Sequence, residues 1–332
     1  MTPPNRILVG DAATMLASLP PQVVDCVVTS PPYFRLRNYQ HPGQLGLEQD
    51  VDEWAQNLRA VMREVGRVLV PTGSVWLNLG DSYSTGGSVA AKSLLLGPER
   101  LALALIEDGW LIRNKIIWAK RNPMPSAVGD RLTCSWEVIY FLTREPHYFF
   151  DLDAIREPHT STKQPVRSVR GWSVPPEWRV ASSNNSGLDA LAARGQVGHP
   201  LGKNPGDVWR LSTASYRGPH HAVFPVALAE RPILAGSPER RCARCHAPWR
   251  RSTLHQLGHL AVRGELQPSC QCPSSSEPAV VLDPFMGSGT TAIAAERHGR
   301  NWIGVELHAD FARSAEQRIA DVRAIDEQRR AA

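Results

Sequence analysis

The sequence predicts a Rossmann-like α/β fold with a doubly wound, mostly parallel sheet of seven strands. Three observations support this fold class. Short apolar runs recur along the 332 residues, helix-like patterns separate many of them, and two of the runs lead directly into turns rich in proline or glycine. A chain of this length can form one large domain with insertions or two domains, and 42% apolar residues suffice for a substantial core.

Seven short apolar runs have the character of strands in such a sheet. They are Arg6–Val9, Val23–Thr29, Gly73–Leu79, Arg113–Trp118, Trp136–Thr143, Ala279–Leu282 and Asn301–Val305. The helix-like patterns are Asp52–Val68, Pro98–Glu107, Thr290–His298 and Ala309–Ala324. Strands that alternate with helices are typical of parallel sheets, because each helix carries the chain back to start the next strand.

Two stretches interrupt this alternation, and we interpret both as insertions. The first, Asp151–His220, is rich in Ser, Pro, Gly, Asn and Arg and carries aromatic residues such as Trp172 and Trp209. A connection of this length inside an α/β domain is usually functional or disordered. Its mixture of aromatic and arginine residues favours a functional loop region. The second stretch, Ser237–Pro278, contains four of the six cysteines.

The composition excludes several classes of protein. No apolar run approaches the roughly 18 residues that a membrane-spanning helix needs. The N-terminus lacks the basic and apolar regions of a signal peptide, so we expect a cytoplasmic protein. The net charge of +5 is compatible with a polyanionic partner without demonstrating one.

A glycine-rich turn follows the predicted strand near the C-terminus. Within Val280–Thr291, Gly287 and Gly289 allow a sharp turn and a close approach of the backbone to a ligand. The run matches neither a P-loop nor the G-x-G-x-x-G pattern. Glu306 ends the next strand, where an acidic side chain can accept hydrogen bonds from ribose hydroxyls. The alternative is a glycine turn that binds no ligand.

A second motif, Ser30-Pro31-Pro32-Tyr33, directly follows the strand Val23–Thr29. The two prolines stiffen the backbone, so a hydroxyl, a rigid carbonyl and an aromatic ring are held together at the edge of the sheet. These groups suit an exocyclic base amine, whose hydrogens Ser30 and the Pro31 carbonyl can accept. Tyr33 can stack on a base that has swung out of the helix. The alternative is a rigid turn without a chemical role.

Thr29–Tyr33 and Asp283–Thr291 resemble the catalytic and cofactor motifs of the amino-methyltransferases of DNA, in the β-class order with the catalytic motif first. The resemblance implies a circularly permuted methyltransferase fold, S-adenosylmethionine as cofactor and double-stranded DNA as substrate. A cognate restriction endonuclease is the implied partner if the enzyme is half of a restriction–modification pair. The catalytic residues would be Ser30, Pro31, Pro32 and Tyr33. The implied cofactor-binding residues are Asp11, Thr29, Phe224, Pro225, Asp283, Pro284, Phe285, Gly287, Ser288, Gly289, Thr290, Thr291 and Glu306.

The resemblance extends through most of the chain. Arg6–Asp11 resembles the strand and acidic residue near the cofactor's adenine. Val75–Tyr83 and Lys115–Arg131 resemble the segments around the base pocket. Val208–Ser212 and His221–Ile233 resemble the segment that closes over the cofactor's methionine.

These matches divide the chain into functional parts. Residues 1–150 and 279–325 would form the catalytic and cofactor-binding domain, 151–220 the target-recognition region, 221–236 the cofactor-closing segment and 237–278 the cysteine-rich insertion. Lys120 and Arg121 would flank the base pocket and hold the backbone of the flipped nucleotide. The alternative for these two residues is an ordinary loop after a strand.

The choice of base depends on the first residue of the catalytic motif. Within the family, Ser30 favours N4 methylation of cytosine, and N6 methylation of adenine is the alternative. Methylation of cytosine C5 needs a cysteine nucleophile, typically after proline, and the chain contains no Pro-Cys pair. Enzymes that methylate RNA or protein glutamine generally have the opposite motif order. A zinc-containing DNA-binding protein without catalysis is disfavoured by the two intact motifs.

The late cysteines form two closely spaced pairs, Cys242 with Cys245 and Cys270 with Cys272. Four thiolates presented by two short loops can hold a structural zinc ion. The second pair has one intervening residue instead of the usual two, and His246, His255 or His259 could replace a cysteine. The alternative is a set of reduced, metal-free cysteines. Cys26 and Cys134 lie in apolar runs and are predicted to be buried thiols.

Overall fold

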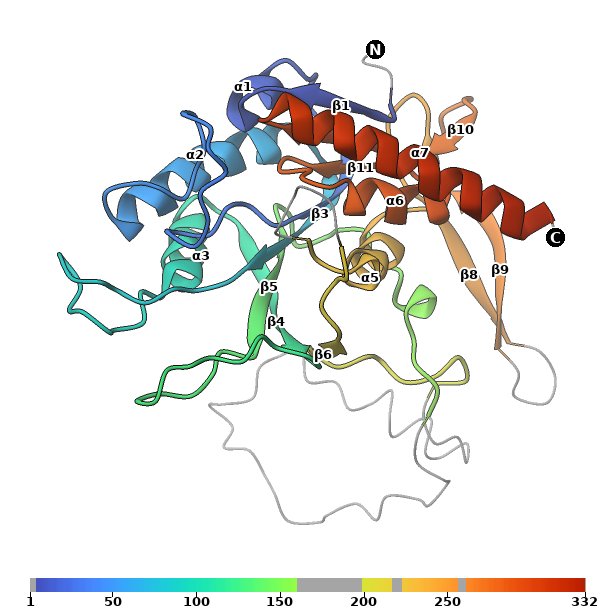
Figure 1. The fold of residues 1–332 in the computed structure, drawn as a ribbon. Coiled ribbons are helices and arrows are strands. Elements are labelled where there is room, and N and C mark those ends of the chain that lie inside the picture. Colours follow the sequence, from blue (N-terminus) through green and yellow to red (C-terminus); the bar gives the residue numbers. More distant parts are fainter. Residues whose placement is uncertain (1–3, 160–198, 217–222, 256–260, 332) are drawn as a thin grey trace, which may run out of the picture. The chain divides into compact units, whose positions relative to one another are not determined.

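The computed structural model describes residues 4–159, 199–216, 223–255 and 261–331. Within them, the main sheet has eight strands in the order β1-β12-β11-β2-β3-β5-β4-β6 (Figure 1). These strands are β1 (Arg6–Val9), β2 (Val24–Thr29), β3 (Leu69–Leu79), β4 (Leu111–Lys120), β5 (Trp136–Thr143), β6 (Val208–Leu211), β11 (Val280–Asp283) and β12 (Asn301–Glu306). Neighbouring strands run parallel except at β5, which is antiparallel to β3 and β4.

The predicted fold class is confirmed, and all seven predicted strands are present. The predicted number of strands was one too low, because β6 adds an eighth strand beside β4. β6 has four residues, of which Val208 and Arg210 are exposed. It therefore shows no apolar run in the sequence, and its position is specified by parallel pairing that sets Trp209 opposite Trp118.

Helices cover both faces of the main sheet (Figure 1). On one face α1, α2 and α3 pack together, and on the other α5 packs against α6, which in turn contacts α7. Their bounds are α1 (Ala12–Ala17), α2 (Val51–Val68), α3 (Gly97–Glu107), α5 (Val226–Gly236), α6 (Thr290–Arg297) and α7 (Ala309–Ala331), and a 3-10 turn η1 spans Leu152–Ala154. Apolar side chains of the first three helices and of the central strands form the main core.

Helix α2 shows how the local sequence positions the edge of the sheet. Asp50 caps its N-terminus by accepting hydrogen bonds from the backbone amides of Asp52 and Glu53. Trp54 and Leu58 lie on the buried face of this helix. The indole nitrogen of Trp54 donates to the Pro32 carbonyl at 2.9 Å. The core helix therefore holds the second proline of the Ser-Pro-Pro-Tyr motif in place.

The strand order brings the two sequence motifs together. β11 pairs in parallel with β2 on one side, through Val281 opposite Cys26, and with β12 on the other. The loops that follow these three strands therefore leave the sheet at the same carboxyl edge. Ligands bind at this edge in open α/β sheets.

The described residues divide into two compact units, the first within residues 1–151, 206–250 and 266–332 and the second within residues 152–205 and 251–265. In the first unit, β7 (Arg240–Cys242) and β10 (Ser276–Pro278) form a small antiparallel sheet. β8 (Trp249–His255) and β9 (Ala261–Pro268) form another two-stranded sheet. In the second unit, the Asp153 carboxylate binds Arg156 at 2.6 Å and Thr253 at 2.7 Å.

The remaining predictions concern the long insertion, the membrane and the isolated cysteines. Residues 160–198 and 217–220 of the predicted target-recognition region lie outside the described residues, so its boundaries stay a prediction. In the described part of the chain, no helix has the length and apolarity needed to cross a membrane. Cys26 is buried as predicted, whereas the prediction for Cys134 was wrong: its thiol is exposed, because it belongs to the loop before β5 and not to the strand.

Candidate active site

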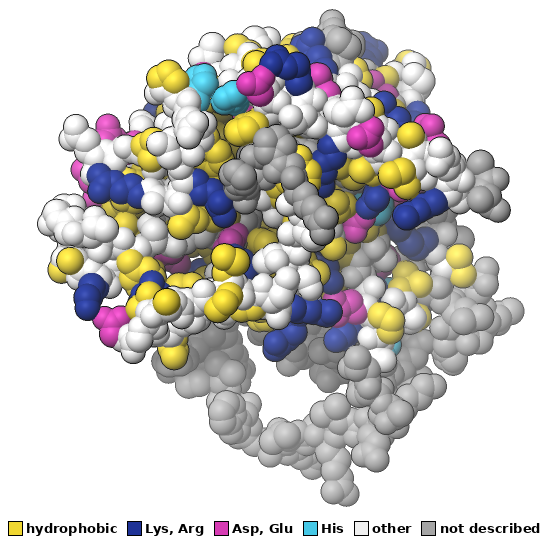
Figure 2. All heavy atoms as spheres, viewed as in Figure 1, with side chains coloured by type: hydrophobic (Ala, Val, Ile, Leu, Met, Phe, Trp, Pro, Cys, Tyr) yellow, Lys and Arg dark blue, Asp and Glu magenta, His cyan; other side chains and the backbone are white. Residues whose placement is uncertain are grey.

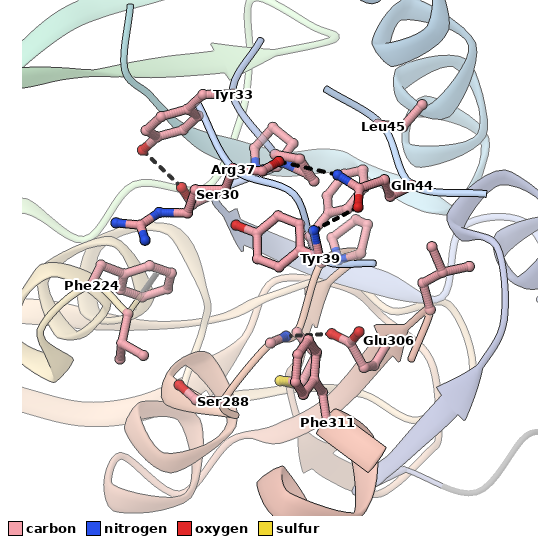
Figure 3. A pocket seen from close by; sticks show the side chains of 18 of the residues that line it. Ser30, Tyr33, Arg37, Tyr39, Gln44, Leu45, Phe224, Ser288, Glu306 and Phe311 are labelled. Atoms are coloured by element: carbon pink, nitrogen blue, oxygen red, sulfur yellow. Dashed lines mark hydrogen bonds between the residues drawn. The ribbon is translucent and has the colours of Figure 1, made fainter. Parts of the chain in front are cut away.

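A cavity of about 550 Å³ lies at the carboxyl edge of the main sheet, within the roughly 300–1,000 Å³ usual for small-molecule sites. Residues of both sequence motifs line it, namely Ser30, Pro31, Pro32 and Tyr33 from the first and Pro284, Phe285, Gly287, Ser288 and Thr290 from the second. Figure 3 shows Ser30, Phe224, Ser288 and Glu306 around this one hollow. The two motifs, far apart in the sequence, therefore share one cavity.

The glycine turn and Glu306 form one wall of the cavity. Gly287 and Gly289 have φ of 51° and 80°, a left-handed conformation that favours glycine. The Gly287 amide donates to Glu306 Oε2 at 2.8 Å, and the His308 amide donates to Oε1 at 2.9 Å. Burial raises the pKa of Glu306 above its ordinary value. Since a carboxylate has about four acceptor positions, Glu306 can also accept hydrogens from a ligand.

Three predicted cofactor residues lie behind this wall. Asp283 is 1% exposed and accepts hydrogen bonds from Thr29 Oγ1 at 2.6 Å, Thr291 Oγ1 at 2.7 Å and the Phe285 amide at 3.0 Å. Burial raises the pKa of Asp283 to about 6, against the lowering effect of these donors. Neither Asp283 nor the two threonines line the cavity. This arrangement supports a role in joining the glycine turn to β2, and not direct contact with a cofactor.

The other predicted cofactor residues are distributed around the cavity. Asp11 lines it and also caps α1, because its Oδ1 accepts from the Thr14 amide at 2.9 Å. Phe224 lines the cavity, whereas Pro225, the residue directly before α5, does not. Gly289 also lies outside the lining, since it packs beneath α7 against Ile319.

A loop that was not predicted from the sequence closes one side of the cavity. Arg37, Tyr39 and Gln44 line it (Figure 3). The Gln44 side chain ties the loop together, accepting from the Tyr39 amide at 2.6 Å and donating to the Arg37 carbonyl at 3.2 Å. Only the position of this loop, directly after the Ser-Pro-Pro-Tyr motif, could have indicated its role.

A polar network surrounds the catalytic motif. The hydroxyls of Ser30 and Tyr33 lie 3.0 Å apart, and Tyr33 donates to Glu137 Oε2 at 2.6 Å. Asn78 Nδ2 lies 2.7 Å from the Tyr33 oxygen and 2.8 Å from Glu137 Oε2. Burial and the nearby Glu137 raise the pKa of Tyr33 well above its ordinary value. The ring of Tyr33 packs closely against Gly80, where an added Cβ would lie only 2.6 Å from it.

Basic and apolar groups complete the side of the cavity next to this network. Lys120 Nζ binds Glu137 Oε1 at 2.6 Å and lies 5.3 Å from the centroid of the Trp118 ring. Met124 lines the cavity but is 85% exposed, so it stands at the mouth. Figure 2 shows Lys and Arg side chains spread over the viewed face. Such a distribution suits a polyanion such as DNA.

The residues at the Glu306 end fit the predicted cofactor, S-adenosylmethionine. Glu306 offers a carboxylate for ribose hydroxyls. Phe285 and Phe311 offer apolar ring surfaces in the same cavity, as an adenine ring requires. The donor set therefore agrees with a nucleoside at this end and leaves the Ser30 end for the group that accepts the methyl.

The four late cysteines form a separate cluster. The sulfur atoms of Cys242, Cys245, Cys270 and Cys272 all lie within 4.8 Å of one another, and sulfurs around a tetrahedral zinc ion lie about 3.8 Å apart for Zn–S bonds of about 2.3 Å. Backbone amides of Cys245 and Arg244 point to the Cys242 sulfur and lower the pKa of this thiol to about 6. His246 is not part of this cluster, and its Nδ1 lies 2.8 Å from the Gln22 carbonyl oxygen. Within the described residues, the four thiols by themselves fit a tetrahedral zinc ion.

Comparison with known proteins gives one consistent result. The family model for DNA methylase matches residues 24–317. The chain is 32% identical over 337 residues to the Type II methyltransferase M.SmaI of Serratia marcescens, covering 95% of this chain and 90% of that protein. It is 30% identical over 414 residues to M.SfiI of Streptomyces fimbriatus, covering 93% and 89%.

Solved structures share the fold. The Thermus thermophilus protein TTHA0409, in complex with S-adenosyl-L-methionine, has a TM-score of 0.54 and 25% identity, covering 96% of this chain and 94% of that chain. The PvuII DNA methyltransferase, which is cytosine-N4-specific, has a TM-score of 0.58 and 18% identity, covering 97% and 92%. At that identity, the PvuII enzyme shows the fold alone.

Proposed function

The chain belongs to the DNA methylase family and is an S-adenosylmethionine-dependent amino-methyltransferase of DNA with the β-class motif order. From this premise, we propose that it methylates the N4 amine of cytosine in duplex DNA. The observation that carries the proposal is the position of Ser30. This serine begins the Ser-Pro-Pro-Tyr motif and lines the same cavity as the glycine turn and Glu306. Within the family, serine at this position favours cytosine.

The proposed reaction needs the target base outside the helix. A base in a duplex is stacked and paired, so its amine cannot reach an enclosed cavity, and enzymes of this kind flip the nucleotide out. The Tyr33 ring, held against Gly80, is a rigid surface on which the flipped base can stack. Lys120, at the same end of the cavity, can bind the backbone of the flipped nucleotide.

Ser30 and the Pro31 carbonyl would make the base amine, which is a poor nucleophile, more reactive. The nitrogen lone pair is delocalised into the ring, and it becomes available only as the nitrogen pyramidalises. Two acceptors on the amine hydrogens favour that change, because their hydrogen bonds strengthen as positive charge develops on the nitrogen. When bound, S-adenosylmethionine supplies the electrophilic methyl group.

We also propose a structural zinc ion in the cysteine cluster. None of the four cysteines lines the cavity, so the ion would take no part in the reaction. Arg241, next to Cys242, donates to the Val23 carbonyl at 2.8 Å and to the Asp25 carboxylate at 2.9 Å. The zinc loops would therefore be anchored to the start of β2, the strand that ends in the catalytic motif.

The biological setting follows from the relatives, which are Type II methyltransferases. We propose that this enzyme protects a DNA sequence against a cognate restriction endonuclease, with residues 151–220 as the target-recognition region. A cytosolic location agrees with the six cysteines, none of which forms a disulfide in the described part of the chain.

Analysis of the methylated product tests the proposed base. DNA methylated by the purified protein is digested to nucleosides and examined by mass spectrometry, and N4-methylcytosine is the expected product. N6-methyladenine would reject the choice of base, and neither product would reject the proposed function. As a check on the site, Ser30→Ala should lower the methylation rate about 100- to 1,000-fold with cofactor affinity unchanged. A wild-type rate in that variant would refute the role of Ser30.

A further inference from the structure

A chain of hydrogen bonds leads from Ser30 to a carboxylate on another strand. The Ser30 hydroxyl lies 3.0 Å from that of Tyr33, which lies 2.6 Å from Glu137 Oε2. The other oxygen of Glu137 binds Lys120 Nζ at 2.6 Å. Glu137 comes from β5, which runs antiparallel to its neighbours, and it lines the cavity together with Ser30 and Tyr33.

The Glu137 carboxylate sets the direction of these hydrogen bonds, because it can only accept them. A carboxylate only accepts hydrogen bonds, so the Asn78 atom that lies 2.8 Å from Glu137 Oε2 must be the amide nitrogen. The same nitrogen lies 2.7 Å from the Tyr33 oxygen, which is nearer than the Ser30 oxygen at 3.3 Å. The single hydrogen of Tyr33 goes to Glu137.

This direction makes Ser30 an acceptor toward the cavity. Because the Tyr33 hydrogen is directed to Glu137, the Tyr33 oxygen can accept the Ser30 hydrogen. The Ser30 hydrogen then points away from the substrate, and its lone pairs can accept a hydrogen of the base amine. The raised pKa of Tyr33 agrees with this arrangement, since the phenol keeps its proton and stays a donor.

We propose that Glu137 is a positioning residue of the methyl transfer, which acts on Ser30 through Tyr33 and receives the proton that leaves the amine. The proposal rests on the proposed function, because it requires Ser30 to face the amine. As the nitrogen bonds the methyl carbon, the carbon–sulfur bond breaks and its electron pair remains on sulfur. The nitrogen proton passes to Ser30 while the Ser30 hydrogen passes to Tyr33 and the Tyr33 hydrogen to Glu137. The product amine is neutral, and the carboxyl group holds the proton until water removes it.

A purely structural role for Glu137 is the competing explanation. In that case its ion pair with Lys120 would serve only to join β5 to β4. A second ion pair resembles that of Lys120 and Glu137 and serves for comparison. Lys115, also on β4, binds Glu99 at 2.6 Å and lies 6.0 Å from the centroid of the Tyr140 ring. Glu99, Lys115 and Tyr140 do not line the cavity. Glu99→Gln therefore removes a similar ion pair without touching the proposed relay.

The test compares Glu137→Gln with Glu99→Gln in single-turnover methylation of DNA at saturating S-adenosylmethionine. Glu137→Gln should transfer methyl about 100- to 1,000-fold more slowly, in the range of a lost proton acceptor, with the affinities for S-adenosylmethionine and DNA unchanged. Glu99→Gln should react at the wild-type rate. In the Tyr33→Phe background, Glu137→Gln should add little, because the relay is already broken at Tyr33.

Three results would overturn the proposal. They are a near wild-type rate in Glu137→Gln, multiplying effects of Glu137→Gln and Tyr33→Phe, or a rate loss that is matched by lost binding of both ligands. The nucleosides formed by the wild-type protein separate this question from the proposed function. If the product is N6-methyladenine, the proposed base is wrong and the relay is tested in the same way, because adenine also presents an exocyclic amine.

Discussion

Replacement of Asp283 by asparagine should stabilise the protein, and the gain should grow as the pH rises. Asp283 is 1% exposed, and burial raises its pKa from 3.8 to about 6. Asparagine can keep the same partners: its oxygen accepts from Thr29 and the Phe285 amide, and its nitrogen donates to Thr291. The Thr291 hydrogen then has the Val28 carbonyl as its acceptor, at 3.1 Å.

The sign and size of this change in the free energy of unfolding follow from the linkage between protonation and folding. The folded protein binds the Asp283 proton more tightly than the unfolded chain does, so the protonated carboxyl stabilises the fold at low pH. This stability is lost as the pH rises from the unfolded pKa of 3.8 through the folded pKa of about 6. The full loss is about 3 kcal/mol, of which about 1–2 kcal/mol falls between about pH 5 and about pH 8. The Asn variant has no such loss.

Urea unfolding of cofactor-free protein, followed by tryptophan fluorescence at a series of pH values, measures this difference. Asp108→Asn is a control of opposite sign, because a hydrogen bond from Arg59 at 2.6 Å lowers the pKa of Asp108. The Asp108 carboxylate stabilises the fold above its unfolded pKa, and this stabilisation is lost as the pH falls. The free energy of unfolding of Asp108→Asn should therefore fall further below that of wild type as the pH rises. A pH-independent difference between Asp283→Asn and wild type would refute the assignment of Asp283 as a buried carboxyl with a raised pKa.

Two further predictions concern the glycine turn and the cysteine cluster. Gly289→Ala should lower the free energy of unfolding by about 1–3 kcal/mol and weaken cofactor binding, since φ is +80° and the new Cβ would lie 2.9 Å from Ile319. Thermal unfolding should show a smaller loss for Gly109→Ala, where φ is +81° and no atom lies within 4 Å. Equal losses of stability in the two variants would show that the contact with Ile319 does not contribute to the effect of Gly289→Ala. The purified protein should contain about one zinc ion per chain, and a chelator that removes it should lower the melting temperature without changing the cofactor affinity of folded protein. Metal-free protein with the same melting temperature would contradict the zinc proposal.

Some elements could not be recognised from the sequence for reasons that the structure makes clear. Helix α5 contains Pro232 in its interior, a residue that usually ends a helix. It forms nonetheless, because its apolar residues are buried against the sheet, with Leu228 and Ile233 at most 1% exposed. β8 has a run of four polar residues, RRST, after its first residue and lacks the apolar character of the strands that were predicted. In both cases tertiary contacts outweigh local preference.

The sequence by itself determined the fold class and the two motifs, because both depend on short-range features. Apolar runs specify buried strands, and the Ser-Pro-Pro and Gly-Ser-Gly turns specify backbone shape within a few residues. Only the tertiary structure decided which distant groups meet at these turns. Glu137 reaches Tyr33 from 104 positions away along the chain, and Thr29 reaches Asp283 from 254. No local pattern encodes such pairs, since they arise from the order and direction in which the strands assemble.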